Sequence, residues 1–178
     1  MEVDLLSQSW VEVEKDYKGG LLNSERCLQA SMYRAFRLHA PGELDTFVEP
    51  ELSLRSKKYR PDLVICEDTR VSAIVEIKFV PHRFARYKRD IDKLQELADM
   101  DDQPISIDPA TGEWSSTTYR ADCCTKLVFA VVARHDSAAL DSHSISARLK
   151  PEFKKRFFLL SGSIGGSHGS CFGCYPCT

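Results

Sequence analysis

The sequence predicts an α/β domain in which helices flank a mixed central β-sheet. Segments with apolar residues at helical spacing alternate with short strand-like segments, which is the order of an α/β domain. In addition, residues 126–133 (KLVFAVVA) are almost all apolar, as expected of a central strand covered on both faces. The chain of 178 residues has room for one such domain, with or without a tail.

The first part of the chain is expected to form two amphipathic helices. Residues 2–17 carry apolar side chains at helical spacing, and Gly19 and Gly20 end that pattern. A second helix should begin near Asn23 or Ser24, because both are good N-cap residues, and should stop before the Ala-Pro-Gly sequence that follows His39. The side chains expected on its inward face are Glu25, Leu28, Met32, Ala35, Phe36 and His39.

Three strands are expected next, over residues 44–48, 62–66 and 72–80. The third alternates, with apolar odd-numbered residues on one face and Glu76 and Lys78 on the other. A helix should follow over residues 83–99, and then a polar loop. The remaining expected elements are a small hairpin around residues 109–112 within the loop 101–122, the central strand at 126–133, a short helix at 137–150 and a last strand at 157–164.

The C-terminal residues 165–178 are rich in Gly and Ser, which predicts a flexible tail behind a domain of residues 1–164. Cys171, Cys174 and Cys177 form a C-x2-C-x2-C run in this tail. Thiolates at such spacing can hold Zn²⁺ or part of an iron–sulfur cluster. An unstructured terminus with incidental thiols explains the same residues without a metal, and we favour that interpretation.

Composition narrows the class of protein. The formal net charge is −2, so nucleic-acid binding would need a local basic patch. The apolar runs are of strand length, and the first residues lack the basic and apolar regions of a signal peptide. Seven Cys, an odd number, favour reduced thiols over a disulfide framework. We therefore expect an intracellular, cytoplasmic protein that does not enter a membrane.

Three charged residues interrupt the apolar strands of residues 60–80. Asp62 opens one strand, while Glu76 and Lys78 lie two residues apart on the next and therefore point to the same side. Mg²⁺ binds carboxylate and carbonyl oxygens, so the carbonyl of Ile77 at the strand edge is a further candidate ligand. An ammonium group beside such a metal can orient a water molecule or stabilise developing charge. Glu25, on the inward face of the preceding helix, could add another carboxylate.

Each of these residues also has a simpler interpretation. Glu76 and Lys78 could form the solvated face of a hairpin, with Asp62 capping a turn. Ile74 and Val80 flank the pair on its own face, however, which indicates a half-buried pocket where unpaired charges would be costly. For Glu25, the helix dipole alone favours an acid in the first helical turn, so both interpretations remain open.

The pattern resembles the PD-(D/E)xK nuclease superfamily, which has the restriction-endonuclease-like fold. Pro61 and Asp62 match the PD element, and residues 76–78 (EIK) match ExK. Glu25 matches the acidic residue that many members carry on the first core helix. The expected order of elements, αβββαβ, also matches over about residues 21–133, which is most of the globular part and leaves residues 1–20 as an additional N-terminal helix.

The resemblance implies a Mg²⁺-dependent nuclease that hydrolyses phosphodiester bonds, with Mn²⁺ as a possible substitute. By resemblance, Asp62 and Glu76 bind the metal and Lys78 assists the attacking water. The carbonyl of Ile77 and the carboxylate of Glu25 complete the expected ligand set. The alternative is a catalytically silent member of the fold that serves as a nucleic-acid-binding or assembly module.

Two basic clusters flank the proposed site and are candidates for phosphate contacts. One is the RSKKYR segment before Asp62, and the other is on the helix after Lys78, where Asp90 and Asp92 dilute the positive charge. Charged helix faces are also commonly just solvated. Some exonuclease relatives carry a Gln on this helix followed four residues later by Tyr, which here is an incomplete match. The candidate nucleic-acid-binding residues are Lys57, Lys58, Arg60, Arg86, Arg89, Lys93 and Gln95.

The expected partner is DNA, with RNA left open. The sequence does not distinguish endonuclease from exonuclease activity. With little room for a separate specificity domain, selectivity would come from loops such as 101–122, from a homodimer or from a protein partner.

Overall fold

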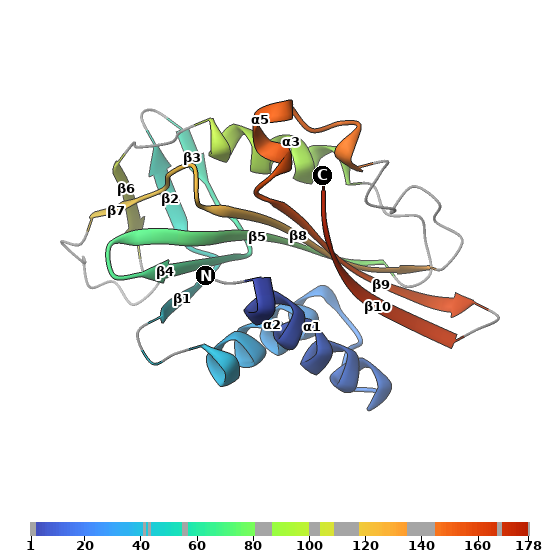
Figure 1. Ribbon diagram of the computed structural model, residues 1–178. Coiled ribbons are helices and arrows are strands. Elements are labelled where there is room, and N and C mark those ends of the chain that lie inside the picture. The colour runs from blue at the N-terminus through green and yellow to red at the C-terminus, as the bar shows by residue number, and fades with distance from the viewer. Residues whose placement is uncertain are drawn as a thin grey trace.

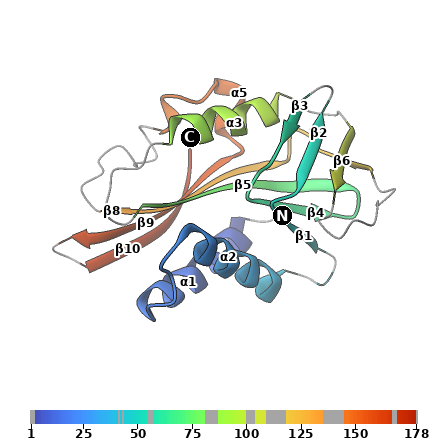
Figure 2. The same cartoon turned by 180° about the vertical axis from the view of Figure 1, so that it is seen from behind.

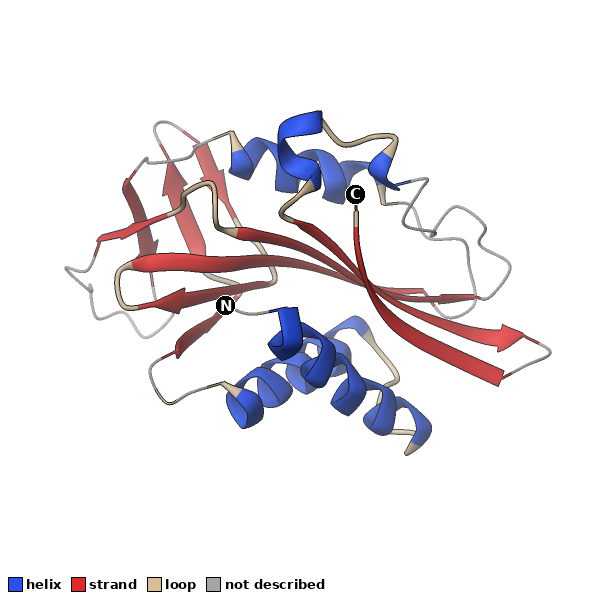
Figure 3. Ribbon diagram, in the orientation of Figure 1, coloured by secondary structure: helices blue, strands red, loops and turns tan. Residues whose placement is uncertain are grey.

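The computed structural model describes residues 3–40, 42, 44–54, 57–80, 87–99, 104–108, 118–134, 145–166 and 169–177. A mixed sheet of ten strands lies between two layers of helices (Figures 1 and 3). Helices α1 (Val3–Lys18) and α2 (Glu25–His39) cover one face, and α3 (Lys88–Ala98) and the single turn α5 (Pro151–Lys154) cover the other. The view from behind shows the same two layers (Figure 2). The predicted α/β class with a mixed central sheet is confirmed.

The centre of the sheet runs in the order β1–β4–β5–β8–β9–β10. Strand β5 pairs antiparallel with β4 and parallel with β8, and β8 pairs parallel with β9. Strands β7, β6, β2 and β3 extend the sheet from the beginning of β5. The bounds are β1 (Leu44–Val48), β2 (Glu51–Leu54), β3 (Lys57–Tyr59), β4 (Leu63–Glu67), β5 (Arg70–Val80), β6 (Pro104–Asp108), β7 (Thr118–Arg120), β8 (Lys126–Arg134), β9 (Phe157–Gly166) and β10 (Gly169–Pro176).

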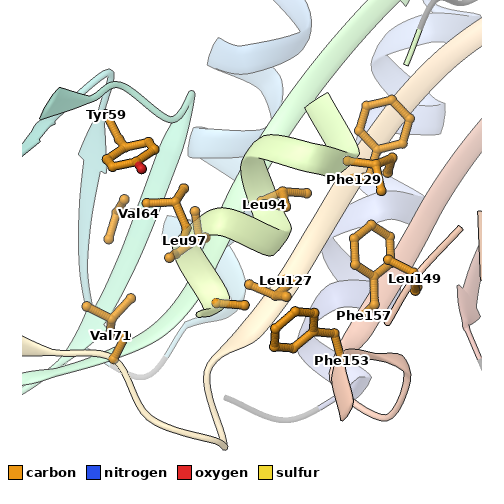
Figure 4. Close-up of a cluster of buried hydrophobic side chains, with 14 of the residues drawn as sticks. Tyr59, Val64, Val71, Leu94, Leu97, Leu127, Phe129, Leu149, Phe153 and Phe157 are labelled. Atoms are coloured by element: carbon orange, nitrogen blue, oxygen red, sulfur yellow. The ribbon is translucent and has the colours of Figure 1, made fainter. Parts of the chain in front are cut away.

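Each face of the sheet has its own hydrophobic core. On the α1/α2 face, Trp10, Met32 and Phe36 pack against the odd-numbered residues of β5. Ser24 begins α2 as its N-cap, since its Oγ accepts a hydrogen bond from the Cys27 N–H at 3.2 Å. On the opposite face, the buried side chains of α3 and α5 pack against β4, β5, β8 and β9 (Figure 4).

A β-bulge interrupts the pairing of β4 with β5. Ile65 pairs with Ala73, but Cys66 pairs with Val71, so Ser72 is an extra residue in β5. The alternation of side chains changes at this point, because Val71 and Ile74 both lie in the core under α3. After the bulge, the even-numbered residues of β5 face α3 and the odd-numbered residues face α1 and α2.

Most of the expected elements are present, but strands β2, β3, β7 and β10 were not expected. The strands expected at 44–48, 62–66, 72–80 and 126–133 are β1, β4, β5 and β8, and the first two helices are also confirmed. Strands β2, β3 and β7 are short and carry charged or polar residues, whereas β6 lies where the first arm of the expected hairpin begins. Helix α3 begins at Lys88, five residues after its expected start, while residues 81–86, the hairpin at 109–112 and most of the helix at 137–150 lie outside the described residues.

The expectation of a flexible tail was wrong for its described part. Residues Gly169–Pro176 form β10, which pairs antiparallel with β9. Gly162 lies directly opposite Phe172, and a Cβ at Gly162 would be only 2.6 Å from the Phe172 ring. That ring packs against Trp10 and Tyr17 of α1, with centroids 5.6 and 5.5 Å away. Glycine in this segment therefore makes room for an aromatic side chain.

Candidate active site

The candidate site lies where β4 begins and β5 continues alone. The pairing of Leu63 with Val75 places Asp62, one residue before β4, beside Glu76. Asp62 Oδ2 accepts a hydrogen bond from the Ile77 N–H at 2.6 Å. Two residues further on, Glu25 Oε2 at the start of α2 accepts one from the Phe79 N–H at 3.3 Å. Two carboxylates thus bind edge N–H groups of β5 where β4 no longer pairs with it.

The main chain of Asp62 is fixed from two other segments. Its carbonyl accepts a hydrogen bond from the Glu49 N–H at 2.9 Å and another from Gln29 Nε2 at 3.0 Å. Glu49 adopts a left-handed conformation with φ of 46°, which is uncommon for a residue other than glycine. The turn between β1 and β2 and the middle of α2 therefore both hold Asp62 in place.

Glu76 is almost fully buried, at 5% exposure, and faces α3. The Lys93 ammonium lies 2.6 Å from Glu76 Oε1 and donates a hydrogen bond to the carbonyl of Arg60, also at 2.6 Å. The contact with Glu76 is an ion pair at hydrogen-bonding distance. Lys93 thus links three segments: α3, the end of β5 and the residues before β4.

Lys78 lies on the same face of β5 as Glu76 but pairs with a different acid. Its Nζ is 3.8 Å from Asp90 Oδ2 on α3, and both side chains are partly exposed. The expected pair of Glu76 and Lys78 is therefore extended by a second pair on α3, Asp90 and Lys93.

Burial raises the pKa of the three acids in this cluster, Asp62, Glu76 and Asp90. Burial is the main cause that raises the pKa of Glu76 to about 8, and the nearby carboxylates of Asp62 and Asp90 add to the rise, while Lys93 opposes it. Burial also raises the pKa of Asp62, against the hydrogen bond from Ile77 and the charge of Lys93. The pKa of Asp90 is raised by burial too, against the charges of Lys78 and Lys93. Carboxylates that are this costly to ionise favour a cation at the site.

The chemistry of the donor set fits a hard divalent cation. Asp62 accepts the hydrogen bond from Ile77 through Oδ2, and Glu76 meets the Lys93 ammonium through Oε1. The Ile77 carbonyl lies on the same edge of β5 as its N–H, and hence on the side of Asp62. Across the described residues, no group of three or more His, Cys, Asp or Glu side chains has the arrangement of a metal site. A cation here would rely on two carboxylates and a backbone carbonyl.

The expected nucleic-acid-binding residues whose side chains the structure describes divide into three groups. Lys58, Arg60 and Arg89 are exposed, with Lys58 Nζ 2.6 Å from Glu51 Oε1. Lys93 lies in the carboxylate cluster. Gln95 is buried, and its Oε1 accepts a hydrogen bond from the Lys150 N–H at 2.8 Å, so its side chain fixes the segment before α5. The side chain of Lys57 and the whole of Arg86 lie outside the described residues.

Cys174 in β10 and Cys177, which follows β10, do not converge on one site. Cys174 packs with the core under α1 and α2, whereas Cys177 lies in the core under α3 and α5. Strand alternation explains this, because residues three apart on a strand point to opposite faces. Burial raises the pKa of the Cys177 thiol to about 11 and also raises that of Cys174, so both thiols are protonated at neutral pH. A site shared by Cys174 and Cys177 is therefore excluded, while the Cys171 side chain is outside the described set.

The sequence interpretation missed the roles of Asp90 and Lys93 at this site. Both were assigned to a basic surface, where Asp90 diluted the charge. A signal was present in the helical spacing, because Asp90 and Lys93 border the buried stripe of Tyr87, Ile91 and Leu94. Charged residues beside such a stripe face the sheet edge as easily as solvent.

Comparisons with known proteins return no match: no family model, no curated protein and no solved structure matches this chain. None of the described helices is both long enough and apolar enough to cross a membrane.

Proposed function

We propose that this protein is a Mg²⁺-dependent nuclease of the restriction-endonuclease-like fold that hydrolyses phosphodiester bonds in DNA. The observation that carries the proposal is the meeting of two carboxylates, half-buried Asp62 and buried Glu76, at neighbouring strands. The ammonium of Lys78 projects from the same face of β5 beside them. With the short strands β2, β3, β6 and β7 set aside, the order α2, β1, β4, β5, α3 and β8 follows the expected αβββαβ pattern and supports the same family.

The bound cation would polarise the phosphate and lower the pKa of a bound water. Asp62, Glu76 and the Ile77 carbonyl would hold it, and Glu25 would hold the end of β5 through the Phe79 N–H. Because Asp62 is fixed by Glu49, Gln29 and Ile77, its carboxylate is already oriented before any ligand arrives.

The reaction adds a water oxygen to phosphorus and breaks the bond from phosphorus to the leaving oxygen. One water proton is released and the leaving oxygen takes up a proton, so the products are a phosphate monoester end and a hydroxyl end. Lys78 would hydrogen-bond the attacking water or the phosphate oxygens. Its 3.8 Å pairing with Asp90 keeps the ammonium near the carboxylates without a hydrogen bond to release.

The test is cleavage of supercoiled plasmid, linear duplex, single-stranded DNA and RNA in Mg²⁺ or Mn²⁺. Asp62→Asn and Lys78→Met are each expected to lower the cleavage rate by about a thousandfold, since metal and charge stabilisation supply several kcal/mol. Lys88→Met, an exposed position on α3, is the matched control and should cleave as the wild type does. Absence of cleavage with every substrate and metal, or equal cleavage by Lys78→Met and wild type, would refute the proposal.

The ion pair between Lys93 and Glu76 favours a second candidate, a catalytically silent nucleic-acid-binding module of the same fold. In that case the ammonium would neutralise the buried carboxylate permanently. This alternative predicts retardation of DNA in a gel that needs no divalent cation and persists in Asp62→Asn. Retardation that requires Mg²⁺ or Ca²⁺ and is lost in Asp62→Asn would reject it.

A further inference from the structure

The Lys93 ammonium sits in surroundings suited to a metal ion. Its nearest oxygens are Glu76 Oε1 and the Arg60 carbonyl, each 2.6 Å away. One carboxylate oxygen and one backbone carbonyl oxygen are ligands that a hard divalent cation takes. The Glu76 side chain is 6% exposed and that of Lys93 is 26% exposed, so the contact is largely removed from solvent.

Lys93 also acts on more of the cluster than Lys78 does. Its Nζ lies 2.6 Å from both Glu76 Oε1 and the Arg60 carbonyl, whereas Lys78 Nζ lies 3.8 Å from Asp90 Oδ2. The fixed positive charge of the cluster is therefore centred on Lys93, which comes from α3 and not from the ExK strand.

We propose that the Lys93 ammonium is a built-in second cation of the site, so that the site binds one divalent ion and not two. The inference rests on the proposed function. Two-metal hydrolytic sites place their ions about 3.5–4 Å apart around shared carboxylates. Lys93 occupies the Oε1 side of Glu76, which leaves Oε2, the second oxygen of Asp62 and the Ile77 carbonyl for a single ion.

A tethered ammonium differs from a second metal ion in two ways. It carries one positive charge instead of two, and chelators do not remove it. It also holds the Arg60 carbonyl, so the residues before Asp62 keep their position when the divalent ion is absent. Lys93 is thus a positioning residue for Glu76 and for the chain leading to Asp62.

The experiment is a count of Mn²⁺ ions bound to the full chain, by titration calorimetry and by electron paramagnetic resonance of free Mn²⁺. Wild type and Lys93→Arg should bind one ion per chain. Lys93→Met should bind a second ion, or bind the first at least tenfold more tightly, because a positive charge next to the ligands has been removed. Lys88→Met on the same helix is the matched control and should bind as the wild type does.

The outcomes separate this inference from the proposed function. Two ions per chain in wild type, or unchanged count and affinity in Lys93→Met, would overturn the role of Lys93 and leave the nuclease proposal standing. Failure of every variant to bind Mn²⁺ would remove the metal site itself, and both proposals with it. If Lys93→Met does not fold, as judged by circular dichroism, Lys93→Gln replaces it with the same expected result, and the wild-type count alone can still overturn the inference.

Discussion

The two faces of strand β5 differ in composition: one carries apolar side chains, and the other also carries charged side chains. On the α1/α2 face, Ala73, Val75 and Ile77 are completely covered by apolar side chains. On the α3 face, Ile74 is followed by Glu76, whose buried carboxylate is held by one ammonium. The first face stabilises the fold through apolar burial. The second stabilises it less, because burying the Glu76 carboxylate has a desolvation cost. Substitutions on the two faces should therefore change stability in opposite directions.

The largest effect is expected on the apolar face. Ile77→Ala should lower the free energy of unfolding by about 2–5 kcal/mol, because the side chain is buried and leaves a cavity. Urea denaturation followed by circular dichroism measures this. The control Val11→Ala, at an exposed position on α1, should change stability by less than about 0.5 kcal/mol. Equal effects of the two substitutions would mean that this face of β5 is not the core.

The same face extends to the C-terminal hairpin, where a smaller effect is expected. Gly162→Ala should destabilise the protein by about 1–3 kcal/mol, because the new methyl group would overlap the Phe172 ring. Faster amide hydrogen exchange in β10 should accompany the loss. The control is Gly42→Ala, where a Cβ would meet no atom within 4 Å. Unchanged exchange in β10 would contradict the packing of Phe172 over Gly162.

On the α3 face, the substitution Glu76→Gln should raise the free energy of unfolding, and the gain should depend on pH. The pKa of Glu76 is about 8 in the folded protein against 4.5 for an unperturbed Glu, so between these values the folded state holds a proton that the unfolded state has lost. Stability therefore falls as pH rises through this window, by about 1 kcal/mol per pH unit. Glu76→Gln should remove this contribution.

Denaturation in EDTA at several values between pH 5 and pH 8 measures the difference. Relative to wild type, Glu76→Gln should gain stability as pH rises, whereas Glu152→Gln, an exposed control on α5, should follow the wild-type curve. Parallel curves for wild type and Glu76→Gln would show that the carboxylate is not buried as described.

The smallest effect is expected for the pair of Lys78 and Asp90. Both side chains are partly exposed and 3.8 Å apart, so a double-mutant cycle with Lys78→Met and Asp90→Asn should give a coupling below about 1 kcal/mol. A coupling of several kcal/mol would place this pair with Glu76 in the buried cluster and would weaken the contrast between Lys78 and Lys93.

The sequence could predict the contacts that depend on short-range periodicity. The parity of Glu76 and Lys78 follows from strand alternation alone, and the proximity of Asp62 to Glu76 follows from a tight turn between their strands. The Lys93 contact could not be predicted in this way, because it depends on how far along β5 helix α3 packs. The contacts within the β4–β5 hairpin could therefore be predicted, whereas the contact between helix α3 and the sheet could not.

The C-terminal segment and the edge strands show a second limit of prediction from sequence, which is that local composition does not reveal strand pairing. A Gly-rich composition suggests flexibility. At Gly162, however, the absence of a side chain makes room for the Phe172 ring, and this role is visible only from the pairing of β9 with β10. The segment KKY forms β3 at the end of the described sheet, where lysines are common, and the sequence alone did not show that it is a strand. Local composition could not distinguish these cases.

The bulge at Ser72 reverses the alternation of side chains in β5, the strand that contains Glu76 and Lys78. Before it, odd-numbered residues of β5 face α3, and after it, even-numbered residues do. A strand of unbroken phase that kept Val71 in place would turn Glu76 away from Lys93 and toward Trp10 and Phe36 on the other side of the sheet. One unpaired residue thus decides which layer of the protein receives the charges, several residues before the first of them occurs.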